Sequence, residues 1–136
     1  MNTDSPGPDS LRFELVVPAE VREGTAVPIV LRLTNTREEP LELHLLGRTI
    51  AFDITVARAD GRLVWRRLEG AAIHGILQIK LLAPGETLEL RDVWRQRDSA
   101  GRPVGPGTYN VQGALPTEAR APLRTAVVRI RVVKPD

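Results

Sequence analysis

Apolar and polar side chains alternate with a period of two along most of this 136-residue chain. The clearest run spans 27–34. There Val27, Ile29, Leu31 and Leu33 alternate with Pro28, Val30, Arg32 and Thr34. Because successive side chains of a strand point to opposite faces, this pattern predicts half-buried strands rather than helices. Strands are predicted on this basis at 11–17, 27–34, 41–45, 52–56, 63–65, 76–82, 88–94, 109–115 and 125–133.

Turn signals separate these runs. Asp60-Gly61 predicts a tight type I′ hairpin turn, and Pro84-Gly85 suits the central positions of a type II turn. No segment sustains a helical period with a cap at each end. About eight or nine short strands joined by Gly and Pro turns predict an all-β fold, an antiparallel two-sheet sandwich.

Two of the predicted strands carry more detailed expectations. In 76–82, Gln78 and Lys80 are expected to mark the solvent side. In the strand that ends at Trp94, the polar Asp92 occupies a position that the alternation assigns to the interior. Either Asp92 points inward together with Trp94, or a β-bulge intervenes near Asp92.

The few aromatic residues are expected to serve the fold. The chain has two Trp, one Tyr and two Phe, so Trp65 and Trp94 are interpreted as core residues more than as binding anchors. Tyr109 follows Gly107 by two residues at the start of a strand, which resembles the tyrosine corner of β-sandwiches, where the hydroxyl bonds the backbone of a nearby loop.

Composition narrows the function classes. Residues 11–134 fit one domain, and the Pro-, Gly- and Ser-rich segment 1–10 is expected to be a disordered tail. The absence of cysteine excludes disulfides and thiolate zinc sites. Acidic residues alternate with arginines without a basic block, and no segment is long and apolar enough to span a membrane. We therefore expect a cytoplasmic protein that binds neither nucleic acid nor membrane.

Residues with catalytic potential form no recognisable pattern. His44 and His74 lack partners at metal-site or triad spacing, and no serine lies in a nucleophile elbow. Asp53 and Asp92 lie on apolar strands, where ion pairs with arginine are the favoured interpretation over general acid catalysis. No glycine-rich segment has the register of a phosphate loop. The sequence thus predicts no enzyme, no metal and no cofactor.

Several of these features occur together in a known family. Val64-Trp65, the Leu-x-Pro-Gly-Glu motif at 82–86, Trp94 and the Pro-Gly-Thr-Tyr-x-Val-x-Gly-x-Leu motif at 106–115 resemble the BsuPI-like domain. This resemblance implies an immunoglobulin-like β-sandwich and an intracellular proteinase inhibitor. The chain departs from the family pattern at 69–75, where a serine and a phenylalanine followed by a polar pair would be expected.

Two functions are weighed on this basis. The first is a protein-binding module that resembles a serine-proteinase inhibitor and acts through exposed loops at 68–75 and 116–122, as a monomer or weak dimer. Its candidate contact residues are Glu69, Ile73, His74, Glu118 and Arg120. The alternative is an assembly domain without a protease target, in which an edge strand such as the arginine-rich last one pairs with another chain.

Overall fold

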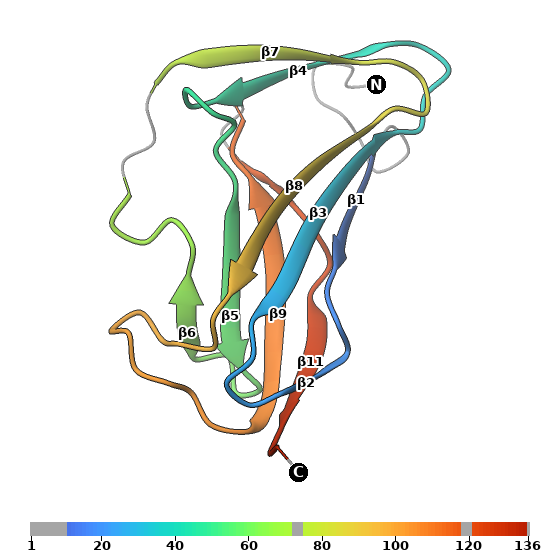
Figure 1. The fold of residues 1–136 in the computed structure, drawn as a ribbon. Coiled ribbons are helices and arrows are strands. Elements are labelled where there is room, and N and C mark those ends of the chain that lie inside the picture. The colour runs from blue at the N-terminus through green and yellow to red at the C-terminus, as the bar shows by residue number, and fades with distance from the viewer. Residues whose placement is uncertain (1–10, 72–74, 118–120, 136) are drawn as a thin grey trace.

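The computed structural model describes residues 11–71, 75–117 and 121–135, and the tail predicted at 1–10 lies outside them. These residues contain no helix, so none of them forms a helix that could cross a membrane. They form eleven strands (Figure 1): β1 (Leu11–Val16), β2 (Glu20–Arg22), β3 (Val27–Asn35), β4 (Leu41–Leu46), β5 (Asp53–Arg58), β6 (Leu63–Arg66), β7 (Leu77–Leu82), β8 (Thr87–Trp94), β9 (Gly107–Leu115), β10 (Leu123–Arg124) and β11 (Val128–Val133).

Two sheets and a ribbon make up the fold. One sheet has the strand order β1-β3-β8, and the other has the order β2-β11-β9-β5-β6, with β10 paired to β9. The β4–β7 ribbon is a separate two-stranded sheet that lies across one end of the molecule in Figure 1. Every pairing is antiparallel except the short parallel contact between β2 and β11.

The immunoglobulin-like antiparallel sandwich expected from the sequence is confirmed, with more strands than predicted. Each of the nine predicted runs contains a strand. The additional strands are β2 and β10, which have three and two residues. Segments this short cannot display an alternating pattern, so periodicity gives no signal for them.

The core lies between the two larger sheets. One face of β3 is buried from Val27 to Leu33 and packs toward the buried face of β9. Trp94 at the end of β8 and Tyr109 near the start of β9 meet edge to face in this core, with ring centroids 5.5 Å apart. Their polar atoms are satisfied: the Tyr109 hydroxyl donates to the Gly105 carbonyl at 2.6 Å, and Trp94 Nε1 donates to the Arg97 carbonyl at 3.0 Å.

The remaining residues expected to serve the fold occupy turns and strand ends. Trp65 is half-buried against the core on β6. Pro84 and Gly85 form the turn between β7 and β8, where the Glu86 amide donates to the Ala83 carbonyl at 2.9 Å and Gly85 has a φ of 79°. Gly107 begins β9 with a φ of 151°.

The β5–β6 hairpin uses a different turn from the type I′ turn that was predicted. Among the described non-glycine residues only Gln96 has a positive φ, so Asp60 does not, whereas Gly61 has a φ of 91°. The Gly61 amide donates to the Arg58 carbonyl at 2.8 Å, and the Arg58 amide donates to the Arg62 carbonyl at 2.9 Å. This is the three-residue loop in which a type I turn is followed by a left-handed glycine.

Strand order corrects one further expectation, and strand register decides between the two possibilities for Asp92. The arginine-rich strand β11 is not an edge, because it lies between β2 and β9. The β3–β8 register runs without interruption from Val27 opposite Trp94 to Thr34 opposite Thr87, so no bulge occurs near Asp92. Asp92 therefore shares the face of Trp94, which was the other possibility.

The solvent side of the 76–82 segment is the reverse of the prediction. Gln78 and Lys80 are half-buried, whereas Leu77, Ile79 and Leu81 are exposed. The reason is a polar contact: the side-chain amide of Gln78 donates to the carbonyls of Gly47 and Arg48, which directly follow β4. A side chain that must reach these carbonyls turns the apolar side chains of β7 outward.

Replacement of Gly113 by alanine should destabilise the protein. A Cβ at Gly113 would lie 2.3 Å from Cδ2 of the fully buried Leu31, so the two sheets can approach this closely only without a side chain there. Gly113→Ala should lower the free energy of unfolding by about 1–3 kcal/mol in urea denaturation, the usual effect of overpacking. Gly105→Ala is the control, because a Cβ added at Gly105 would meet no other atom within 4 Å. Equal stability of the two variants would contradict this account of the packing.

Candidate functional site

The start of the 68–75 loop and both ends of the 116–122 loop lie at one shared cleft. The 68–75 loop connects β6 to β7, and the 116–122 loop connects β9 to β10. Leu68 from the first loop and Pro116 and Pro122 from the second all line a cleft of about 320 Å³, which we call the base cleft. The rest of its lining comes from the strands beneath: Asp53, Thr55, Arg66, Gln112, Gly113, Ala114 and Arg124.

Only part of the predicted contact set can be placed. Glu69 is exposed directly after Leu68. Ile73, His74, Glu118 and Arg120 lie outside the described residues. The structure therefore places the start of the 68–75 loop at the same cleft as the two ends of the 116–122 loop, and it leaves the contact roles of these five residues as predictions.

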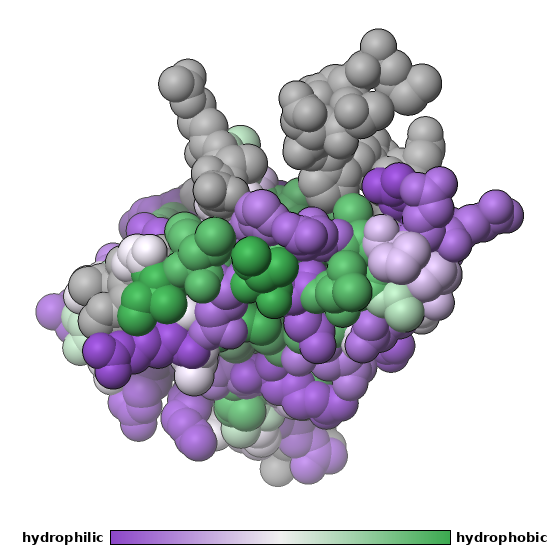
Figure 2. Space-filling model, turned by 90° about the horizontal axis from the view of Figure 1, so that it is seen from above, coloured by the Kyte–Doolittle hydropathy of each residue, from purple (hydrophilic) through white to green (hydrophobic). Residues whose placement is uncertain are grey.

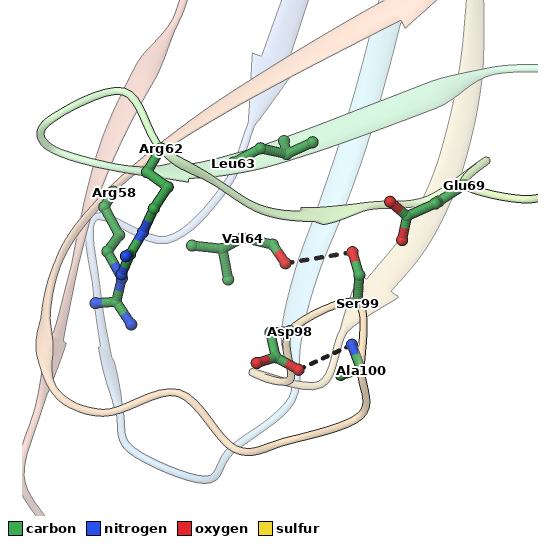
Figure 3. A pocket seen from close by; sticks show the side chains of 8 residues that line it. All are labelled: Arg58, Arg62, Leu63, Val64, Glu69, Asp98, Ser99 and Ala100. Carbon is green, nitrogen blue, oxygen red and sulfur yellow. Dashed lines mark hydrogen bonds between the residues drawn. The ribbon is translucent and has the colours of Figure 1, made fainter.

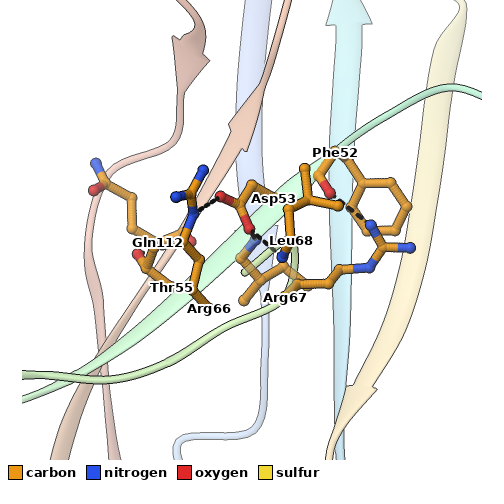
Figure 4. A network of polar contacts seen from close by, with 8 residues as sticks. Phe52, Asp53, Thr55, Arg66, Arg67, Leu68 and Gln112 are labelled. Carbon is orange, nitrogen blue, oxygen red and sulfur yellow. Dashed lines mark hydrogen bonds and ion pairs between the residues drawn. The ribbon is translucent and has the colours of Figure 1, made fainter. Parts of the chain in front are cut away.

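Asp53 anchors the first residue of the 68–75 loop. Its carboxylate is buried, and Oδ1 accepts hydrogen bonds from the amides of Ile54 at 2.9 Å and Leu68 at 3.0 Å. Oδ2 accepts from Arg66 Nε at 2.6 Å, as Figure 4 shows. The carboxylate thus joins β5, the end of β6 and the loop, with charge-assisted bonds on both oxygens.

The side chain of Arg67 extends to the other side of the chain from Arg66 (Figure 4), as adjacent residues in an extended segment do. Its guanidinium donates to Asp92 Oδ2 at 2.5 Å and to the Phe52 carbonyl at 2.6 Å, and it lies 3.7 Å from the centre of the Phe52 ring. Since Asp92 belongs to β8, this contact connects the loop to the opposite sheet. We call Arg66, Arg67 and their two aspartate partners the arginine clamp.

Asp53 favours the charged form of Arg66. The hydrogen bond and the negative charge of Asp53 raise the pKa of Arg66 above its usual value, with burial acting weakly in the opposite direction. The Arg66 guanidinium is thus held in its charged form in this contact. Both aspartates on apolar strands are thus held in arginine ion pairs, in agreement with the interpretation favoured from the sequence.

A second cleft of about 320 Å³ lies beside Glu69. Figure 3 shows Arg58 and Arg62 on one side of it and Glu69 on the other. The Ser99 hydroxyl donates to the Val64 carbonyl at 3.4 Å, and Asp98 accepts the Ala100 amide at 2.9 Å. No histidine is among the described residues that line this cleft, so they form no serine–histidine pair there.

The described residues also hold no metal-binding cluster. No group of three or more His, Cys, Asp or Glu side chains in these parts of the chain has the geometry for a metal ion. His44 Nε2 lies 2.7 Å from a carboxylate oxygen of Glu42 on the exposed face of β4.

The arginine clamp was missed from the sequence as a site, although a signal for it was present. Arg66 ends β6 and Arg67 directly follows it, and two aspartates occupy inward positions of other strands. That pattern indicates ion pairs but not their pairing, because the partners lie 13 and 25 residues apart and only the sheet topology brings them together.

Removal of the Asp53 carboxylate should loosen the start of the 68–75 loop. Asp53→Ala leaves the amides of Ile54 and Leu68 without their acceptor, at a cost of about 1–3 kcal/mol in the free energy of unfolding. Arg66→Ala should cost less than about 1 kcal/mol, because that side chain is 49% exposed and water replaces its contact. Urea denaturation and hydrogen exchange at the Leu68 amide measure both effects. Equal losses in the two variants would show that the ion pair, not the amide contacts, holds the loop.

Comparison with known proteins identifies one family. The model of the BsuPI family, described as intracellular proteinase inhibitor, matches residues 10–120. No curated protein matches the sequence.

Comparison with solved structures finds proteins with a similar fold at low sequence identity. The CARDB domain of the PF1109 protein from Pyrococcus furiosus is 14% identical with a TM-score of 0.49, over 92% of this chain and 94% of that one. The alkylpurine DNA glycosylase AlkC of Pseudomonas fluorescens is 17% identical with a TM-score of 0.48, over 90% of this chain. A β-glucosidase of Listeria innocua is 13% identical with a TM-score of 0.46. This chain spans only 30% of the glycosylase and 16% of the glucosidase.

Proposed function

The chain belongs to the BsuPI family of intracellular proteinase inhibitors, and from that premise we propose that it is a non-catalytic inhibitor that binds a serine proteinase through the 68–75 and 116–122 loops. The observation that carries this proposal is the base cleft, since residues from both loops line it. A proteinase that contacts one loop would therefore meet the other.

The arginine clamp supports this role by holding the start of the 68–75 loop in place. An inhibitor gains affinity when its contact loop is ordered before binding, because less conformational entropy is lost in the complex. Asp53 fixes Leu68, and Arg67, the residue before Leu68, bonds Asp92 of the opposite sheet and the Phe52 carbonyl just before β5. From Glu69 onward the described loop residues are exposed, so a partner can reach them.

The 116–122 loop offers the more specific contact. Pro116 and Pro122 bracket it and limit its conformational freedom. Arg120 near its end has the charge and length to enter a proteinase specificity pocket that carries a carboxylate. We therefore propose a trypsin-like serine proteinase as the target, with Arg120 as the residue in its specificity pocket.

A non-catalytic role agrees with the state of the acidic side chains. A general acid or base must be free to exchange a proton with a substrate. Asp53 and Asp92 are instead held by Arg66 and Arg67 in contacts of 2.6 and 2.5 Å.

The inhibitory function can be tested with a panel of purified serine proteinases. Trypsin, chymotrypsin and subtilisin are each titrated with the protein, and residual hydrolysis of a small substrate is measured. We expect inhibition of trypsin in the micromolar range or tighter. Full activity of all three enzymes at micromolar protein would sink the proposal.

Replacement of Arg120 should abolish most of this inhibition without affecting the fold. Arg120→Ala should raise the inhibition constant for trypsin about tenfold or more, since a buried charge pair in a specificity pocket is a typical hot spot. Arg129→Ala, an exposed arginine on β11, is the matched control and should change it less than about twofold. Equal inhibition by both variants would remove Arg120 from the interface.

A further inference from the structure

The outer strand of the β4–β7 ribbon presents a row of apolar side chains to solvent. Leu77, Ile79 and Leu81 are 42%, 62% and 60% exposed, and Ile76 just before them is 46% exposed. Figure 2, which views this end of the molecule from above, shows green apolar side chains gathered in a band between purple polar ones. Such a row on one strand is unusual for an isolated protein surface.

The same residues of β7 also carry its unpaired backbone groups. The Gly47 amide donates to the Ile76 carbonyl at 2.9 Å, one step beyond the Leu46–Leu77 pair, so this bond marks a hydrogen-bonded position of the ribbon. Such positions recur at every second residue of an antiparallel ladder. Ile76, Gln78, Lys80 and Leu82 therefore direct their amides and carbonyls toward β4. The amides and carbonyls of the intervening residues point to the outer edge, where no described strand pairs with them.

Other edges of the described sheets are protected in ways that β7 is not. The edge strands β2 and β6 have only three and four residues. The edge strand β1 carries the exposed pair Arg12 and Glu14, and β8 carries the exposed Glu89 and Arg91. Short length and outward charge are the usual means by which proteins prevent edge pairing. On β7 the one charged residue, Lys80, is half-buried on the opposite face, so its outward face is uncharged.

We propose that the outer edge of β7 binds an extended segment of the target proteinase with apolar side chains at alternate positions, which adds a strand to the β4–β7 ribbon. This inference rests on the proposed function and specifies where its partner docks. Main-chain hydrogen bonds to the odd-numbered residues of β7 supply the pairing. Cross-strand contacts with Leu77, Ile79 and Leu81 select apolar side chains in the incoming segment.

Area and continuity favour the proteinase over a second copy of this chain. Three partly exposed side chains offer much less than the roughly 800 Å² per partner of a stable interface. A partner must therefore extend beyond the ribbon, and the ribbon is joined to both candidate loops. Gly75 of the first loop lies one residue before Ile76, and Leu45 of β4 bridges Thr117 of the second.

Two substitutions at one position test the backbone and side-chain parts of this proposal separately. Ile79→Pro removes the outward amide and leaves the pairing with β4 intact, because proline is tolerated where an edge amide faces solvent. Ile79→Thr keeps the amide and the β-branched shape but replaces the apolar side chain. Val16→Thr on β1 makes the same chemical change at a side chain of similar exposure, 49%, and is the matched control.

The measured quantity is the inhibition constant against whichever of trypsin, chymotrypsin and subtilisin the unmodified protein inhibits most. Both Ile79 variants should raise it about tenfold or more, and Val16→Thr less than about twofold. Urea denaturation verifies that each variant is folded. If Ile79→Pro does not fold, the inhibition constant of Ile79→Thr decides whether the β7 edge is the docking site.

Three outcomes overturn the inference. If the Ile79 variants inhibit like the unmodified protein, the β7 edge is not the docking site, and the proposed function stands. If the unmodified protein inhibits none of the three enzymes, the proposed function fails, and the docking site fails with it. If sedimentation shows a concentration-dependent dimer that Ile79→Pro abolishes, a second copy occupies the edge instead of a proteinase.

Discussion

The close approach of β3 and β9 at Leu31 and Gly113 is the constraint on which the remaining structure depends. Leu31 is fully buried and lies where any side chain at residue 113 would be. With this contact, the distance between the sheets suits the edge-to-face packing of Trp94 and Tyr109. It also places β8 within reach of an arginine that follows β6 in the other sheet. The sheet separation thus determines whether Arg67 can contact Asp92.

The arginine clamp uses the separation of the two sheets to fix the start of the 68–75 loop. Arg66 and Arg67 are adjacent in the chain, yet one bonds an aspartate of its own sheet and the other bonds an aspartate of the opposite sheet. Neither ion pair needs to add much stability, since one arginine is half exposed and such pairs are individually weak. Their effect is positional: they hold Arg66 and Arg67 on either side of the chain, next to the Leu68 amide that donates to Asp53.

The sequence predicts the strands well because half-buried strands alternate, and it predicts less where pairing depends on distant partners. β3 and β9 follow from their own residues, whereas β2 and β10 are too short to show a period. The outward turn of Ile79 could not be predicted, since it follows from carbonyls of Gly47 and Arg48 that only folding brings within reach of Gln78. The base cleft depends in the same way on loops nearly 50 residues apart, so both loops could be nominated but their proximity could not.

Burial in the core does not explain the apolar row on β7. In β3 Val27, Ile29, Leu31 and Leu33 are buried and the alternate side chains are exposed or half-buried, so burial accounts for the pattern. In β7 only Leu82 is buried, and Ile79 and Leu81 are more than half exposed. Polar β-branched side chains would serve an exposed edge equally well and would reduce the risk of aggregation. The strand thus retains apolar side chains at the positions where its backbone is also unpaired, and a binding role accounts for both features together.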